Sequence, residues 1–272
     1  AYELLRSLVG SEMCIRDRYQ TSGTTGWPTS FYQSRTQLAW DRASQLRFLS
    51  WCGIDRGEMV ASIWGRRVVG SRWSLLLSDL KLRYLSREFG INVAQFSPDS
   101  MREFVKTLWR IRPKMLRGYT TPVVEFARFV LEEKLDAPPL LATSTTAELI
   151  MPFQKRLVEE AFKAPHFDQY GCGECNGISY ECDHHRGLHV AMEHCVVEVV
   201  DEQGNRLPPG MTGNLAITTL DNEAFPFVRY VCGDEASLLP EPCTCGRGLP
   251  LMSHVSGRTM DMIRGINGNR VW

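Results

Sequence analysis

Three short segments contain the residue types from which a site for a phosphorylated ligand can be built. The first is a run of hydroxyl and glycine residues, Thr21-Ser22-Gly23-Thr24-Thr25-Gly26. Its glycines allow the backbone to approach an anion closely, and its hydroxyl and N–H groups can donate hydrogen bonds to phosphate oxygens. Two further segments follow in order, Tyr170-Gly171-Cys172-Gly173-Glu174 and Arg229-Tyr230-Val231-Cys232-Gly233-Asp234. Together the three segments predict a nucleotide site.

The first segment is not a Walker A loop. That pattern ends in Gly-Lys-Ser/Thr, and no lysine follows Gly26. Runs of hydroxyl and glycine residues are also common in solvent-exposed turns, so the segment alone would not indicate a nucleotide. The prediction depends on the two downstream segments.

Composition excludes several classes of partner. The chain has 272 residues and 43% hydrophobic content, enough to bury a large core in one or two domains. Its 31 basic and 31 acidic side chains balance, so we expect neither nucleic acid nor an anionic membrane as a partner. The sequence has no apolar run of membrane-spanning length and no secretory pattern, which predicts a cytoplasmic protein. Composition leaves the oligomeric state open.

The first eighteen residues stand apart from the rest. Residues 7–18 resemble translated sequencing-adaptor read-through, so we expect residues 1–18 to be a non-native leader. The alternative is an ordinary amphipathic helix at the terminus.

Cysteines and histidines suggest a metal centre. The nine cysteines are an odd number, which favours reduced thiols or metal ligands over a disulfide framework. A Cys-x6-His pair and a Cys-x-Cys pair have the types and number suited to a closed, structural Zn²⁺ site. The predicted ligands are Cys182, His189, Cys243 and Cys245.

Other assignments of the metal ligands remain open. Cys172 and Cys175 have the Cys-x-x-Cys spacing of a zinc half-site, but they interrupt the segment that we expect to face the nucleotide. His184 and His185 are nearby alternatives, and a set of reduced cysteines without metal is a further one.

Helical and strand patterns alternate along the first two thirds of the chain. Ser34 can cap a helix that runs to about Cys52, and apolar residues spaced as on one helical face predict a helix after Ser97-Pro98 that ends at Pro113. Further helices are expected at 121–131 and 152–162, and strands at 31–33, 58–64, 115–116 and 140–142. This alternation predicts an α/β fold with a mostly parallel sheet and flanking helices.

The pattern changes at Gly187. Five short strands separated by turns predict a β-rich subdomain, at 189–192, 195–200, 214–220, 227–231 and 236–239. We therefore expect an α/β nucleotide-binding subdomain at 19–186, the β-rich subdomain at 187–257, and a hinge with the start of a further domain at 258–272.

Five motifs in this order resemble the adenylate-forming superfamily of acyl-CoA synthetases. They are the segment 21–26, Thr146-Ala147-Glu148, Tyr170-Gly171-x-x-Glu174, Pro226-x-x-Arg229-Tyr230-x-x-Gly233-Asp234 and Gly257-Arg258. The chain is most similar to the branch of phenylacetate-CoA ligase, CapK and coenzyme F390 synthetase, and the resemblance covers residues 19–272. The Glu181-Cys182, Gly187-Leu188-His189 and Cys243-Thr244-Cys245 segments also look similar in this branch.

The resemblance implies a reaction in two steps. A carboxylate attacks the α-phosphate of ATP to give acyl-AMP and pyrophosphate, and the thiol of coenzyme A then displaces AMP. It implies that Thr21, Ser22, Gly23, Thr24, Thr25 and Gly26 hold phosphates, with Thr24 also catalytic. It further implies that Ala147 and Glu148 line the adenine, that Tyr170 stacks on it, and that Gly171 belongs to the same nucleotide-binding segment. Glu174 would be catalytic as the Mg²⁺ ligand, Asp234 would bind the ribose, and Arg258 would reach ribose or phosphate.

The chain departs from the family pattern at three positions. Trp27 replaces the usual lysine, Gly173 the usual threonine or serine, and Met260 the usual hinge aspartate. The resemblance also implies that the chain ends where the domain with the adenylation lysine begins, so we expect this fragment alone to be inactive.

The substrate is predicted only as a small carboxylic acid. Four aromatic residues could line an apolar pocket for an aromatic acid, although core packing is the more common explanation for such residues: Trp64, Trp73, Tyr84 and Tyr119. Two other functions stay open, a non-catalytic or regulatory nucleotide-binding homologue and a zinc-stabilised structural module.

Overall fold

The computed structural model describes residues 15–20, 30–65, 87–258, 263–264 and 270–271. The chain divides into two compact units. One, the parallel unit, is Leu49–Gln169, and the other, the antiparallel unit, combines Ala1–Phe48 with Tyr170–Trp272. None of the helices in the described ranges has the length and apolar character needed to cross a bilayer.

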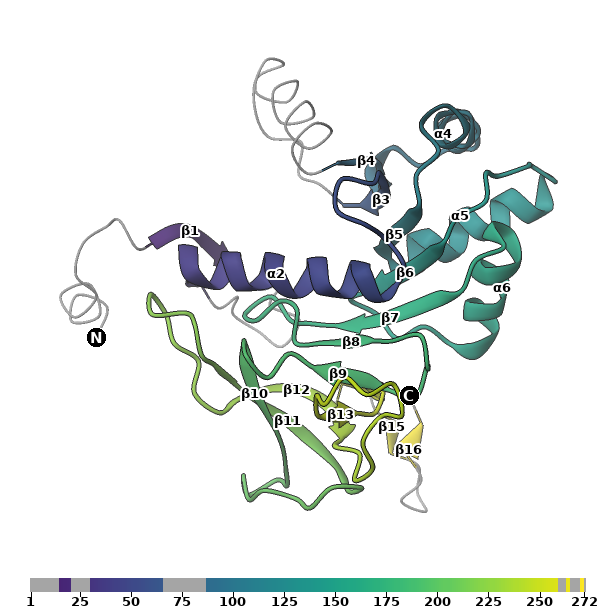
Figure 1. The fold of residues 1–272 in the computed structure, drawn as a ribbon. Helices are drawn as coiled ribbons and strands as arrows, with labels where there is room; N and C mark the ends of the chain where they lie inside the picture. The colour runs from purple at the N-terminus through teal and green to yellow at the C-terminus, as the bar shows by residue number, and fades with distance from the viewer. Residues whose placement is uncertain (1–14, 21–29, 66–86, 259–262, 265–269, 272) are drawn as a thin grey trace. The chain divides into compact units, whose positions relative to one another are not determined.

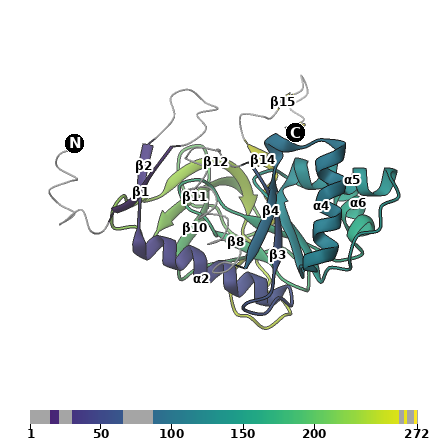
Figure 2. The same cartoon turned by 90° about the horizontal axis from the view of Figure 1, so that it is seen from above.

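The parallel unit is a layer of helices on a parallel sheet. Its strands pair in the order β7-β6-β5-β3-β4, all parallel. Figure 2 shows α4, α5 and α6 on the same side of β3 and β4. The strands are β3 (Val60–Trp64), β4 (Glu88–Asn92), β5 (Met115–Tyr119), β6 (Ala142–Thr146) and β7 (His166–Tyr170). The helices are α4 (Pro98–Ile111), α5 (Thr120–Glu132) and α6 (Pro152–Phe162), with a short 3₁₀ turn, η1 (Val93–Gln95).

Local signals explain where α4 begins and ends. The Ser97 hydroxyl accepts a hydrogen bond from Ser100 N at 3.2 Å, and the Ser100 hydroxyl accepts one from Ser97 N at 2.9 Å, a reciprocal N-terminal cap. Arg112 adopts a left-handed conformation at the C-terminal end, before Pro113. The buried face of α4 packs into the core of the unit through Phe104, Val105 and Leu108.

The antiparallel unit contains several small sheets and one long helix (Figure 1). Strands pair antiparallel in the orders β10-β11-β12-β14 and β13-β9-β8. In addition, β1 pairs with β2, and β15 pairs with β16, also antiparallel. Its elements include β1 (Ile15–Gln20), β2 (Ser30–Ser34), α2 (Arg35–Trp51, which ends just inside the parallel unit), β8 (Ser179–Glu181) and β9 (Leu188–Val190). The remaining strands are β10 (Cys195–Val200), β11 (Thr212–Thr219), β12 (Tyr230–Ser237), β13 (Leu251–Met252), β14 (Gly257–Arg258), β15 (Ile263–Arg264) and β16 (Arg270–Val271).

The predicted fold class is confirmed: a mostly parallel sheet with helices, and a β-rich part. The predicted helix cap at Ser34 is also confirmed, because its hydroxyl accepts a hydrogen bond from Gln37 N at 3.0 Å. The prediction of separate strands at 227–231 and 236–239 is wrong, since β12 is a single strand. Strand β1 begins within the predicted leader, and both the origin of residues 1–18 and the predicted domain boundaries stay predictions.

Candidate functional site

Two of the predicted nucleotide contacts, Tyr170 and Asp234, lie in direct contact. Tyr170 is the last residue of β7, and its hydroxyl donates a hydrogen bond to Asp234 Oδ2 at 2.7 Å. Burial raises the pKa of the Tyr170 phenol well above its usual range, and the neighbouring Cys232 and Asp234 raise it further. The phenol therefore stays protonated and continues to donate to the carboxylate.

An irregularity in β12 places Asp234 opposite Tyr170. Val231 pairs with Ala216 and Glu235 with Asn214, so three residues of β12 lie opposite the single residue Leu215 of β11. Gly233, in the middle of this bulge, has φ +83°, a conformation that glycine adopts without strain. Glycine at position 233 therefore suits the bulge, which leaves Asp234 without a partner in the ladder with β11.

The predicted Mg²⁺ ligand Glu174 is held by two neighbours. The Tyr230 hydroxyl donates to Glu174 Oε1 at 2.7 Å, and Gln37 Nε2 of α2 donates to the Glu174 backbone carbonyl at 3.1 Å. Glu174 is only 7% exposed, which is low for a carboxylate. Burial and the bond to Glu174 raise the pKa of the Tyr230 phenol, so Tyr230 remains a donor.

Sequence reasoning assigned no role to Tyr230 or Gln37. Tyr230 could have been found, because it lies in the same motif and on the same strand as Asp234. Gln37 has no such signal, since only folding brings α2 beside residue 174. Arg229, the motif's arginine, binds elsewhere: its Nε donates to Glu198 Oε2 at 3.0 Å and its guanidinium to Gly204 O at 2.8 Å.

The loop between Tyr170 and Glu174 closes tightly on itself. Cys172 N donates to Cys175 O at 3.0 Å, and a Cβ on Gly171 would lie 3.0 Å from Gly177 N. A Cβ on Gly173 would meet nothing within 4 Å. Glycine is therefore needed at position 171 for the close approach of the backbone, whereas position 173 has room for a side chain.

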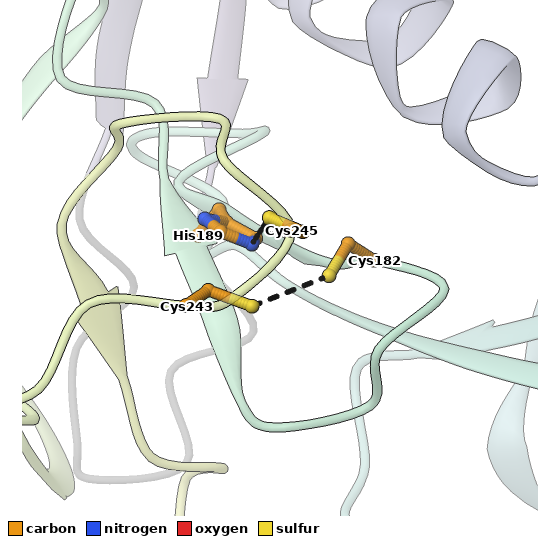
Figure 3. Close-up of side chains that lie close together, drawn as sticks. All are labelled: Cys182, His189, Cys243 and Cys245. Carbon is orange, nitrogen blue, oxygen red and sulfur yellow. Dashed lines mark hydrogen bonds between the residues drawn. The ribbon is translucent and has the colours of Figure 1, made fainter.

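The four predicted zinc ligands lie together (Figure 3). Cys182 follows β8, His189 lies on β9, and Cys243 and Cys245 lie on the loop between β12 and β13. Their ligand atoms all lie within 4.8 Å of one another. The Cys182 and Cys243 sulfurs are 3.8 Å apart, and Cys245 Sγ is 3.4 Å from His189 Nε2.

These separations suit a tetrahedral zinc ion. Tetrahedral zinc bonds of about 2.3 Å to sulfur and about 2.0 Å to nitrogen place two sulfurs about 3.8 Å apart and sulfur and nitrogen about 3.5 Å apart. Burial lowers the pKa of His189, which favours the neutral imidazole that binds metal. Burial opposes ionisation of Cys245, but hydrogen bonds from Arg247 lower its pKa below the usual thiol value.

The alternative half-site is arranged differently. Burial and the other thiols raise the pKa of Cys172, and Cys175 Sγ lies 3.8 Å from His194 Nε2. Neither cysteine belongs to the one cluster of three or more potential ligands found in the described part of the chain. His184 instead places Nδ1 2.9 Å from the hydroxyl of Thr244, which lies between the predicted zinc ligands Cys243 and Cys245.

The predicted adenine residues Ala147 and Glu148 belong to the parallel unit. Ala147 has φ +74°, a conformation that is uncommon outside glycine and that recurs at functional sites. Glu148 accepts hydrogen bonds from the backbone N–H of Thr121, at 2.9 Å, and from its hydroxyl, at the N-terminus of α5. Their role toward a nucleotide stays a prediction.

Several other predicted residues are described in part or not at all. Arg258 on β14 lies directly opposite Asp234 on β12 in the antiparallel register. The segment 21–26, including Thr24, lies outside the described residues, as do Trp27, Met260, Trp73 and Tyr84. Their predicted roles stay predictions.

Comparison with known proteins gives one consistent result. No protein-family model matches the chain. The phenylacetate-coenzyme A ligase of Thermus thermophilus is 31% identical over 261 residues, which cover 92% of this chain and 56% of that protein. Protein CapK of Staphylococcus aureus is 25% identical over 226 residues, 80% of this chain and 47% of that protein.

A solved structure shares the fold. The crystal structure of 2-hydroxyisobutyryl-CoA ligase in the postadenylation state, in complex with R3-HIB-AMP, aligns with a TM-score of 0.75 at 23% identity. The alignment covers 95% of this chain and 54% of that chain. The chain belongs to the adenylate-forming acyl-CoA ligase superfamily.

Within this superfamily, the chain spans about half the length of the curated relatives that it matches.

Two of the four aromatic residues predicted to line an acid pocket are in contact, since the Trp64 and Tyr119 rings lie 4.9 Å apart, edge to face. The Trp64 indole N–H also donates to Glu88, which forms a buried ion pair with Arg117 at 2.8 Å. That the substrate is a small carboxylic acid stays a prediction, based on the resemblance to this superfamily.

Proposed function

We propose that the chain is the nucleotide-binding part of an AMP-forming carboxylate-CoA ligase. This enzyme would use ATP to convert a small carboxylic acid to acyl-AMP and then transfer the acyl group to coenzyme A. The observation that carries the proposal is the pairing of two segments far apart in sequence: Tyr170 with Asp234, and Glu174 with Tyr230.

These residues suit the handling of an adenosine phosphate. Tyr170 offers an aromatic surface for the adenine, and its hydrogen bond orients the Asp234 carboxylate, whose oxygens can accept from ribose hydroxyls. Orienting both groups before the nucleotide arrives reduces the entropy lost on binding. The work of this part of the site would be positioning, which can account for a large share of a rate enhancement.

Glu174 suits Mg²⁺ because it is a hard oxygen ligand on a short, closed loop. When bound, Mg²⁺ would neutralise charge on the phosphates. Glu174 is held at two points, because Tyr230 donates to its carboxylate at Oε1 and Gln37 donates to its backbone carbonyl. The loop, and not Glu174 alone, would therefore set the position of the ligand.

We also propose that Cys182, His189, Cys243 and Cys245 hold a structural Zn²⁺ ion. With four protein ligands no coordination position remains for a substrate, which is typical of structural sites. The ion would tie β8 and β9 to the loop after β12, the strand of Asp234.

The test of the ligase function is carboxylate-dependent ATP–pyrophosphate exchange by the protein that contains this chain. Glu174→Gln should lower exchange by about tenfold or more, as expected when a preorganised group that stabilises charge is lost. Glu223→Gln makes the same chemical change at an exposed position of the same unit and should leave exchange unchanged. Absence of exchange over a broad panel of acids, in protein that is folded, would overturn the proposal.

One observation favours a second candidate, a nucleotide-binding homologue without catalysis. Position 173 has space for the hydroxyl residue that the resemblance implies, yet the chain has glycine there. Such a protein would bind ATP or AMP and form no acyl-AMP. Detection of acyl-AMP would eliminate this candidate.

A further inference from the structure

His194 lies in the turn between β9 and β10, outside every motif, and its side chain is fully buried. The backbone of His194 is held by hydrogen bonds at both its N–H and its carbonyl. The N–H donates to Ala191 O at 2.9 Å, and the carbonyl accepts from Leu220 N at 3.1 Å. The ring therefore has a defined position in the antiparallel unit.

Both ring nitrogens of His194 face hydrogen-bond acceptors. Nδ1 lies against Asp221 Oδ2 in a short contact. Nε2 lies 2.8 Å from the Asn176 backbone carbonyl and 2.8 Å from Asp41 Oδ1. A neutral imidazole has one N–H, which would leave either the carbonyl or the Asp221 carboxylate without its donor. The imidazolium satisfies both sides at once.

The charges around the ring agree with this assignment. Burial by itself would lower the pKa of His194, but hydrogen bonds to Asp221 and Asp41 outweigh it and raise the pKa to about 12. A third neighbour is the thiol of Cys175. Without the cation, two carboxylates would be left near each other in a buried cluster, which is strongly unfavourable.

The contacts of His194 lead to the loop that carries Glu174. Asn176, whose carbonyl faces Nε2, is two residues after Glu174. Asp41 lies one turn after Gln37 on α2, and Gln37 holds the Glu174 carbonyl directly. On the other side, the Asp221 carbonyl accepts from the Ser34 hydroxyl at 2.9 Å, at the start of the same helix.

We infer that His194 is a permanently protonated positioning residue whose imidazolium fixes the 174–176 segment against α2 and so sets the place of Glu174. The inference rests on the proposed function insofar as Glu174 is a Mg²⁺ ligand. Partners that orient a metal ligand typically contribute about 10- to 100-fold to metal affinity. His194 would affect Mg²⁺ binding through the loop that carries Glu174, without touching the ion or the nucleotide.

The first experiment needs no variant. Long-range ¹⁵N spectra of the histidine rings in the wild-type protein should show both nitrogens of His194 protonated throughout pH 6–9. A His194 ring that loses a proton within this range would overturn the inference, whatever the protein binds.

The second experiment separates positioning from general stability. In His194→Gln, the Mg²⁺ concentration for half-maximal ATP binding should rise about 10- to 100-fold, while AMP affinity without Mg²⁺ changes less than about threefold. Glu193→Gln is the matched control. Glu193 lies in the same turn as His194, and the change removes its exposed ion pair with Arg47. Its Mg²⁺ dependence should be that of the wild type.

Asp41→Asn provides a milder variant if His194→Gln does not fold, and it should shift the Mg²⁺ dependence in the same direction by a smaller factor. An unchanged Mg²⁺ dependence, or an equal loss of AMP and Mg²⁺ affinity, would overturn the positioning role. Failure of the wild-type protein to bind any nucleotide would overturn the proposed function and the link to Mg²⁺, and the ¹⁵N spectra would still decide the charge of His194.

Discussion

The hydrogen bond between Tyr170 and Asp234 makes a quantitative prediction for Tyr170→Phe. The variant keeps the aromatic ring and loses only the donor 2.7 Å from Asp234 Oδ2. A hydrogen bond to a charged group contributes about 1.5–3 kcal/mol to the free energy of unfolding. At about 2–4 °C per kcal/mol, the melting temperature should fall by about 3–12 °C. If Asp234 binds the ribose, AMP affinity should also fall by about tenfold, which corresponds to about 1.4 kcal/mol.

A double-mutant cycle isolates this interaction. Urea unfolding of Tyr170→Phe, Asp234→Asn and the double variant should give a coupling energy of about 1–3 kcal/mol, as expected for residues in contact. Asp201→Asn is the control, because in the described part of the chain the Asp201 carboxylate bonds within its own turn, to Gln203 and Asn205, and the change should be additive with Tyr170→Phe. Additivity of Tyr170→Phe and Asp234→Asn within about 0.5 kcal/mol would refute the reasoning.

Three further predictions concern the metal, the glycines and pH. Metal analysis should find about one zinc per chain in the wild type and far less in Cys243→Ser. Removal of the metal by a chelator should lower the melting temperature. Well under one zinc per chain in the wild type would contradict the site. Gly171→Ala should cost about 1–3 kcal/mol, because its Cβ meets backbone at 3.0 Å, whereas Gly173→Ala should be neutral or stabilising by up to about 1 kcal/mol in the same urea experiment. Since the pKa of His194 is raised from 6.5 to about 12 on folding, its contribution to stability is complete below about pH 6.5 and is lost as pH rises toward 12, by about 1.4 kcal/mol per pH unit. Urea unfolding at pH 7–10 should show this decline in the wild type and a flatter profile in His194→Gln. The groups that face the ring are Asp41, Asp221 and Cys175.

The sequence was sufficient where local chemistry decides the structure. Helix α6 has the predicted bounds and α4 begins as predicted, because proline and a capping side chain mark their starts. The four residues predicted as zinc ligands do lie together, and they could be named because cysteine and histidine have few other uses at such spacings. The helix starts depend on residues within a few positions of one another, and the metal cluster is made of two local pairs, Cys182 with His189 and Cys243 with Cys245.

The remaining features depend on contacts that no local pattern encodes. Strand β12 was predicted as two strands because the Cys232-Gly233-Asp234 bulge interrupts its alternation, and the bulge is the feature that aims Asp234. His194 was missed because its partners, Asp41 and Asp221, come from distant parts of the chain. A buried histidine without a motif gives no sequence signal that separates it from a core residue.

The two phenol–carboxylate pairs cross between the same two segments. The 170–174 segment contributes the phenol of one pair and the carboxylate of the other, and the 230–234 segment does the reverse. A shift of either segment would therefore disturb both carboxylates together, so the predicted ribose and Mg²⁺ contacts are mechanically coupled. The predicted zinc ligands Cys243 and Cys245 lie on the loop that follows β12, and His194 contacts the loop after Glu174, so each segment would have a separate support. For this reason we expect loss of zinc to weaken binding through Asp234 first, and loss of the His194 charge to weaken it through Glu174 first.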